Sequence, residues 1–137
     1  GYRNDKYRYF GTAAARLDDM LNFIPARMGG TLMCMAARLC GYDSKGAWRI
    51  FRRDRRAHAS PNSAHTEAAM AGALGLTLGG DAVYFGELHR KPTQGDGRRA
   101  AADDIVRANR LTRTTAWLAL GVGILLRLVI LWIGGWI

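Results

Sequence analysis

The longest apolar stretch of the 137-residue chain lies at its C-terminus, where residues 115–137 contain one ionisable side chain, Arg127. As a helix, this stretch reaches about 34 Å, enough to cross a hydrocarbon core of roughly 30 Å. Trp117 and Trp132 lie toward opposite ends, as interfacial aromatic residues do. The pattern predicts a transmembrane helix, in which we expect Arg127 to pair with another helix rather than to contact a substrate.

A second apolar segment, residues 21–40, is interrupted by a proline, two glycines and two arginines. Its longest uncharged part, residues 28–37, is shorter than the ~20 residues that a confident span requires. The segment therefore either spans the bilayer with its arginines reaching the surface, or enters the bilayer and returns. A full crossing would separate residues 1–20 from the rest of the polar chain. If both parts serve one site, we expect a re-entrant or steeply tilted segment.

The polar region between the two apolar segments is strongly basic. Residues 42–113 hold 13 of the 20 Lys and Arg, which predicts a cytoplasmic location by the positive-inside rule. Residues 44–56 have the pattern of a basic amphipathic helix, with Trp48 and Phe51 on one side. Such a helix suits a membrane surface.

Small residues dominate the next predicted helix. The turn Ser60-Pro61-Asn62 leads into a helix that carries Glu67 in its first turn. Alanines and glycines over residues 68–75 predict that this helix packs closely against other helices or against a ligand. The chain as a whole, residues 1–137, is therefore predicted to be a single mainly α domain, a fragment of a polytopic helical membrane protein.

Short β-structure and a final helix complete the predicted elements. Residues 76–85, with a Gly-Gly-Asp turn, predict a β-hairpin. Residues 91–97 predict a polar connector. Residues 100–113 predict a helix that contains an Asp103/Arg107 pair and continues into the transmembrane segment.

The formal net charge of +9 invites nucleic-acid, anionic-lipid and phosphorylated-substrate partners. We do not expect nucleic-acid binding, because few stacking aromatic residues lie among the arginines. Cys34 and Cys40 lack the spacing of metal or redox motifs, so we expect them to be buried thiols. A Walker-type phosphate loop is absent, since Gly41 and Gly46 are followed by Ala47.

Two groups of polar residues are candidates for chemistry. On a helix, Asp18, Asp19 and Asn22 fall within an arc of about 100°, where the carboxylates could hold Mg²⁺. The alternative is a solvated helix face with an Arg16/Asp19 pair. A histidine side chain ordinarily has a pKa of about 6.5, so His58 is the natural proton acceptor, although it could instead pair with Asp54.

Residue runs that occur together and in order across residues 1–87 carry a family resemblance. The main runs are Arg16-Leu17-Asp18-Asp19, Ile24-Pro25-Ala26-Arg27, Arg53-Asp54, Ser60-Pro61-Asn62, Glu67-Ala68-Ala69, Leu78-Gly79-Gly80 and Tyr84-Phe85-Gly86. They resemble the C-terminal part of the CobD/CbiB family, the membrane-bound adenosylcobinamide-phosphate synthases of cobalamin biosynthesis. The chain departs from the family pattern at residues 64–67, where His65 is a titratable group without an assigned role.

The resemblance implies a ligase that joins a corrinoid substrate, adenosylcobyric acid, to aminopropanol or its O-phosphate through an amide bond, using ATP and Mg²⁺. It implies a multi-pass protein of the plasma or inner membrane, so the lipid bilayer is an expected partner. The alternative is a non-catalytic membrane subunit or scaffold. The residues expected to act fall into three groups: catalytic His58, Asp54, Glu67 and Asn62; substrate- or phosphate-binding Arg16, Arg27, Arg53, Ser60 and Tyr84; and metal-binding Asp18 and Asp19.

Overall fold

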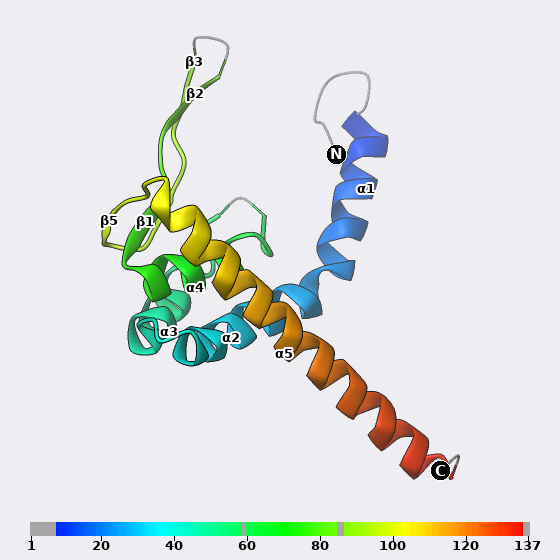
Figure 1. Cartoon of the computed structure of the whole chain (residues 1–137). Coiled ribbons are helices and arrows are strands. Elements are labelled where there is room, and N and C mark those ends of the chain that lie inside the picture. The colour runs from blue at the N-terminus through cyan, green and yellow to red at the C-terminus, as the bar shows by residue number, and fades with distance from the viewer. Residues whose placement is uncertain (1–7, 59, 85–86, 136–137) are drawn as a thin grey trace.

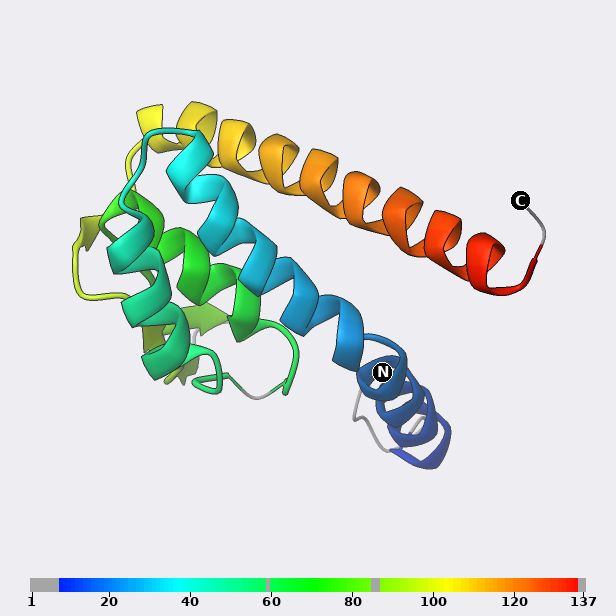
Figure 2. The same cartoon turned by 90° about the horizontal axis from the view of Figure 1, so that it is seen from below.

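The computed structural model describes residues 8–58, 60–84 and 87–135, and it is mainly helical, as predicted (Figure 1). The described chain contains five helices and five short strands. The helices are α1 (Arg8–Leu21), α2 (Phe23–Leu39), α3 (Ser44–Asp54), α4 (Ala64–Leu74) and α5 (Asp103–Ile133). Helices α2, α3 and α4 pack into a bundle, α5 lies along α2, and α1 projects away from the bundle (Figures 1 and 2).

The bundle is held together by small side chains on α4. Most residues of this helix are buried, and Gly72 lies directly against the α3 backbone at Gly46 and Ala47. A Cβ atom built on Gly46 would come within 2.8 Å of the Gly72 carbonyl oxygen. The predicted close packing of this Ala/Gly helix is therefore confirmed, since neither glycine leaves room for a side chain.

Helix α3 is amphipathic, as its sequence predicts. The Asp43 side chain caps its start by accepting a hydrogen bond of 2.8 Å from the Gly46 amide. Ile50 and Phe51 are buried against the bundle, whereas Arg52 and Arg53 are exposed. The helix ends at Asp54, two residues earlier than the predicted boundary at residue 56.

The strands pair differently from the predicted hairpin over residues 76–85. Strand β1 (Leu76–Gly79) pairs antiparallel with β4 (Thr93–Gln94) and parallel with β5 (Arg98–Arg99). Strand β2 (Ala82–Tyr84) instead forms a separate two-stranded ribbon with β3 (Glu87–His89). The predicted pairing of β1 with β2 is therefore wrong.

The glycines after β1 explain this difference. Gly79 and Gly80 both have positive φ, 77° and 94°, so the backbone leaves β1 in a direction that does not return along it. The absence of a Cβ on Gly79 also lets the Pro92 carbonyl and the Gln94 side chain approach closely. The predicted polar connector at residues 91–97 consequently supplies a strand of the sheet.

Helix α5 is the one helix of the described residues that is long and apolar enough to cross a membrane. It has 31 residues, or about 46 Å, and joins the predicted helix at 100–113 to the predicted transmembrane segment without a break. Leu111 and Thr115 are buried against the bundle, whereas the apolar window lies wholly outside the protein interior. Figure 2 shows this part of α5 running past the end of the bundle. The helix ends at Ile133, and residues 136–137 lie outside the described chain.

The second apolar segment forms α2, a single helix that starts directly after α1. Asn22 separates the two helices, and Pro25 lies in the first turn of α2, where its missing N–H has no intrahelical partner to lose. Residues 23–39 are continuous, and their buried face packs against α4 and α5. The placement of this segment in a bilayer stays a prediction.

An ion-pair cluster fixes the start of α5 to the sheet. Both oxygens of the buried Asp104 carboxylate accept hydrogen bonds of 2.7 Å from the Arg98 guanidinium of β5. Asp104 also accepts hydrogen bonds from the Ala101 amide and from Arg107. The predicted Asp103/Arg107 pair is wrong, because Asp104 rather than Asp103 faces the sheet.

We expect Gly72→Ala to lower the free energy of unfolding by about 1–3 kcal/mol, because its methyl group would collide with the α3 backbone. The matched control is Gly121→Ala on α5, where an added Cβ has no atom within 4 Å. That change should be neutral or slightly stabilising, since alanine favours helix by up to about 1 kcal/mol. Thermal unfolding in detergent measures both, and equal melting temperatures would contradict the close contact.

Candidate functional site

Several of the predicted site residues meet where the junction of α1 and α2 contacts the loop between α3 and α4. The Asn62 side-chain amide donates a hydrogen bond of 2.9 Å to the Asp19 carbonyl. Its oxygen accepts one of 3.3 Å from the Arg27 guanidinium. We call Asp19, Arg27, Ser60 and Asn62 the junction cluster. It joins the α1–α2 junction to a loop that lies 35–43 residues further along the chain.

The Asp19 carboxylate is only loosely bound within the junction cluster. Its Oδ1 accepts long hydrogen bonds from the Ser60 hydroxyl, at 3.4 Å, and from the Asn62 amide, at 3.5 Å. Its Oδ2 has no hydrogen-bond or ion-pair partner among the described residues. Asp18 differs, because its Oδ1 accepts a hydrogen bond of 2.9 Å from Asn22. The Oδ2 of Asp18 likewise has no partner in the described chain, so both carboxylates can bind a ligand, and Asp19 is the one that lies in the junction cluster.

Arg27 supplies the positive charge of the junction cluster. Its guanidinium lies 3.3 Å from the centroid of the Phe23 ring and donates a hydrogen bond of 2.7 Å to the Phe23 carbonyl. These contacts orient the planar group while leaving several of its five N–H donors available. A carboxylate or phosphate could therefore bind beside Asn62.

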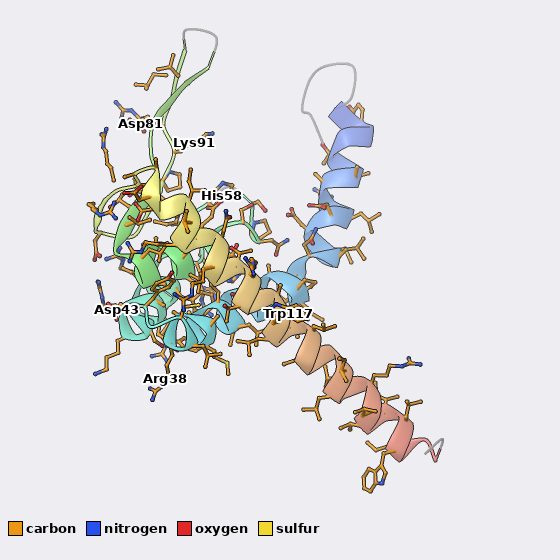
Figure 3. All side chains as sticks on the ribbon, in the orientation of Figure 1. Arg38, Asp43, His58, Asp81, Lys91 and Trp117 are labelled. Carbon is orange, nitrogen blue, oxygen red and sulfur yellow. The ribbon has the colours of Figure 1, made fainter. Side chains whose placement is uncertain are left out.

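His58 lies on the same loop, on the side of the bundle that faces α1 (Figure 3). Its Nδ1 accepts a hydrogen bond of 3.0 Å from the Ser60 amide, which assigns the remaining proton of a neutral ring to Nε2. The alternative His58–Asp54 pair is not formed. To take up a proton at Nδ1, the imidazole must first release the Ser60 amide.

The other predicted residues lie outside the junction cluster. Glu67 is half-buried in the first turn of α4 and has no hydrogen bond or ion pair within the described chain. Arg16 is exposed on α1, beside a shallow hollow that Tyr9 and Thr12 also line. Tyr84 belongs to β2, but its side chain lies outside the described residues. Their roles stay predictions.

Arg53 and Asp54 belong to a second network that joins α3 to the sheet. The Arg53 guanidinium contacts Asp54 at 2.6 Å and Asp96 at 2.9 Å, and Arg49 also pairs with Asp96. Hydrogen bonds from Arg53 hold the pKa of the buried Asp54 below its usual value, with help from the Gly95 amide. The two arginines likewise lower the pKa of Asp96 to about 2. The charges of Arg53 and Asp54 are therefore used within the protein, and their predicted catalytic and phosphate-binding roles stay predictions.

Gln94 is a residue that the sequence pattern did not single out. Its side chain is 2% exposed, and its amide donates a hydrogen bond of 2.7 Å to the Ala57 carbonyl, directly before His58. Strand β4 thereby holds the start of the loop that carries His58 and Asn62. A glutamine in a polar connector gives no sequence signal for this role, because the contact depends on the pairing of β4 with β1.

His65 is buried without a hydrogen-bond partner for either ring nitrogen in the described part of the chain. Its ring lies 5.8 Å from that of Phe51, and its backbone carbonyl approaches Gly30 of α2. Burial lowers the pKa of the imidazole, and the positive charges of Arg27, Arg55 and Arg56 lower it further. The Pro61 carbonyl opposes this shift without reaching hydrogen-bond geometry. The neutral ring is therefore the form that the fold accommodates.

Comparison with known proteins identifies the family of the chain. The family model described as CobD/Cbib protein matches residues 1–112. The chain belongs to the CobD/CbiB family. Its relatives include the cobalamin biosynthesis proteins CobD of Geobacter metallireducens, 58% identical over 96 residues, and of Citrobacter koseri, 49% identical over 128 residues. No solved structure matches the chain.

The CobD/CbiB chain spans less than half the length of these relatives. The match covers 70% of the chain and 30% of the Geobacter metallireducens protein, and 93% of the chain and 40% of the Citrobacter koseri protein. The CobD of Clostridium perfringens is 41% identical over 131 residues, or 95% of the chain and 42% of the relative. The match to the family model includes the entire junction cluster and stops within α5.

In this CobD/CbiB protein, Gln94→Leu should loosen the loop between α3 and α4. The Ala57 carbonyl would lose the hydrogen bond that it accepts from the Gln94 side chain. We expect faster hydrogen–deuterium exchange of the backbone amides of Ser60, Asn62 and Ser63. Thr93→Ala is the matched control, since Thr93 is exposed on the same strand. Equal exchange in the two variants would show that Gln94 does not hold the loop.

The buried His65 should make stability depend on pH. Its pKa is lower in the folded protein than the unfolded value of about 6.5, so the unfolded chain binds more protons as the pH falls below that value. The melting temperature should therefore fall between pH 7.5 and pH 5.5. A His65→Leu variant should lose part of this dependence, measured by thermal unfolding at both pH values. An identical pH dependence in both proteins would contradict the assignment.

Proposed function

We propose that the chain carries part of the active site of an adenosylcobinamide-phosphate synthase. The reaction would join a propionate carboxyl of adenosylcobyric acid to the amine of aminopropanol or its O-phosphate, with ATP as the energy source. Family membership and the name that the relatives share, cobalamin biosynthesis protein CobD, support this proposal.

The single observation that carries the proposal is the junction cluster. Asp19 comes from α1, Arg27 from α2, and Ser60 and Asn62 from the loop between α3 and α4, yet hydrogen bonds join all four. These positions match the runs on which the family resemblance rests. A carboxylate, a guanidinium, a hydroxyl and an amide in contact can orient a charged substrate and stabilise a developing charge.

Amide formation requires the incoming ammonium to lose a proton before its nitrogen attacks the activated carboxyl carbon. Asp19 can orient the ammonium, because its Oδ2 has no partner in the described residues. Arg27 can hold the carboxyl or phosphate oxygens through its unused N–H groups. His58 can act as the proton acceptor once substrate binding frees Nδ1 from the Ser60 amide.

The donor set suits Mg²⁺ only when substrate phosphates complete its coordination. The described residues contain no group of three or more His, Cys, Asp or Glu side chains that could hold a metal ion. Mg²⁺ often binds through one or two carboxylates together with water and phosphate oxygens. Asp19, with the adjacent Asp18, fits that arrangement. Bound there, Mg²⁺ would neutralise phosphate charge.

The location that best suits α5 is the plasma or inner membrane. Its apolar part would lie in the bilayer, and the arginines at positions 107, 110 and 113 would remain on the cytoplasmic side. The junction cluster would then work next to the membrane surface as part of a multi-pass protein.

Asn62→Ala in the full-length protein should reduce amide formation by about 100-fold or more, because Asn62 joins Asp19 to Arg27. Asp19→Asn should have a similar effect through loss of the carboxylate. Asp103→Asn is the control, since this exposed carboxylate makes no hydrogen bond or ion pair in the described chain. Product formation is measured with purified enzyme in detergent. Normal turnover by both cluster variants would favour the scaffold alternative.

A further inference from the structure

One face of the small sheet carries a second polar site. The sheet hollow, of about 580 Å³, is lined by Thr77, Gly80, Asp81, Lys91, Thr93 and Arg99. It lies at the base of the β2–β3 ribbon, where Figure 3 labels Asp81 and Lys91. Its volume is within the usual range for small-molecule sites, roughly 300–1,000 Å³.

Strand register explains why these side chains share a face. Thr77 pairs with Arg99, and Gly79 pairs with Thr93, so positions 77 and 79 of β1 and their partners lie on one side of the sheet. The alternate positions, Leu76 and Gln94, are buried on the other side. The hollow is therefore a built polar face, backed by the core.

The unused polar groups of the hollow define its ligand. The Arg99 guanidinium and the Thr93 hydroxyl have no hydrogen-bond or ion-pair partner in the part of the chain that the structure describes. Both are donors suited to a phosphate. Asp81 accepts a hydrogen bond of 3.3 Å from the Lys91 amide through Oδ1, which leaves Oδ2 for a cationic group. The negative charge of Asp81 would repel a ligand that is only an anion. A ligand that also carries an ammonium would instead pair with Asp81.

We propose that the sheet hollow binds a small amino phosphate, with its phosphate at Arg99 and Thr93 and its ammonium at Asp81. Lys91 adds positive charge near the phosphate. The inference does not rest on the proposed function, because the hollow shares no residue with the junction cluster.

Three probes separate the parts of this ligand: O-phosphoethanolamine, ethyl phosphate and ethanolamine. Calorimetric titration of the full-length protein in nanodiscs measures their binding. We expect O-phosphoethanolamine to bind at least about threefold more tightly than ethyl phosphate or ethanolamine, each of which carries only one of its two charged groups. Arg99→Gln should weaken both phosphate probes by about tenfold, the usual effect of losing a charge-assisted hydrogen bond. Asp81→Asn should weaken the two probes that carry an ammonium, O-phosphoethanolamine and ethanolamine, and should not weaken ethyl phosphate.

Arg90→Gln is the matched control, because Arg90 is exposed beside Lys91 but does not line the hollow. Thr93→Val provides a second test of the phosphate contacts if Arg99→Gln fails to fold by thermal unfolding. Unchanged phosphate binding in a folded Arg99 or Thr93 variant, or no saturable binding by the unmodified protein, would overturn the proposal. If the unmodified protein still forms the amide in that case, the proposed function stands although the proposal for the hollow fails.

Discussion

The close contact between α3 and α4 is the constraint on which the rest of the structure depends. Gly46 and Gly72 bring the two backbones together at a distance that no side chain could occupy. The segment that connects the two helices therefore spans a short distance, and it is the loop that carries His58, Ser60 and Asn62. Tight helix packing therefore places the polar loop at the edge of the bundle, within reach of α1 and α2.

That loop is held from both ends by different parts of the chain. Gln94 of β4 binds its start at Ala57, while Asp19 and Arg27 bind Asn62 near its end. The Arg53–Asp54–Asp96 network also fixes the helix that precedes it. The sheet and the α1–α2 junction thus position a short segment that has little secondary structure of its own. Ion pairs that use the charges of Arg53 and Asp54 support the site through this framework.

The sequence predicts the helices well because their patterns are local. The apolar run of α5, the amphipathic face of α3 and the small residues of α4 each need only neighbouring positions to be recognised. The four residues of the junction cluster could be named from the sequence, because the family runs contain them, but the contacts among them could not. The prediction of the hairpin is wrong because strand pairing is not local. The partners of β1 follow the β2–β3 ribbon in the sequence, and two glycines with positive φ direct the chain away from β1. Gln94 and the partner of Arg107 depend on that same long-range pairing.

Helix α5 gives the arrangement a mechanical character. Its first turn is ion-paired to β5 through Asp104, Leu111 about two turns further on is buried among α2 residues, and its apolar part continues without a break to Ile133. A continuous helix that is anchored at two points near one end acts as a lever. A tilt of its apolar end is therefore passed on to the sheet and the bundle.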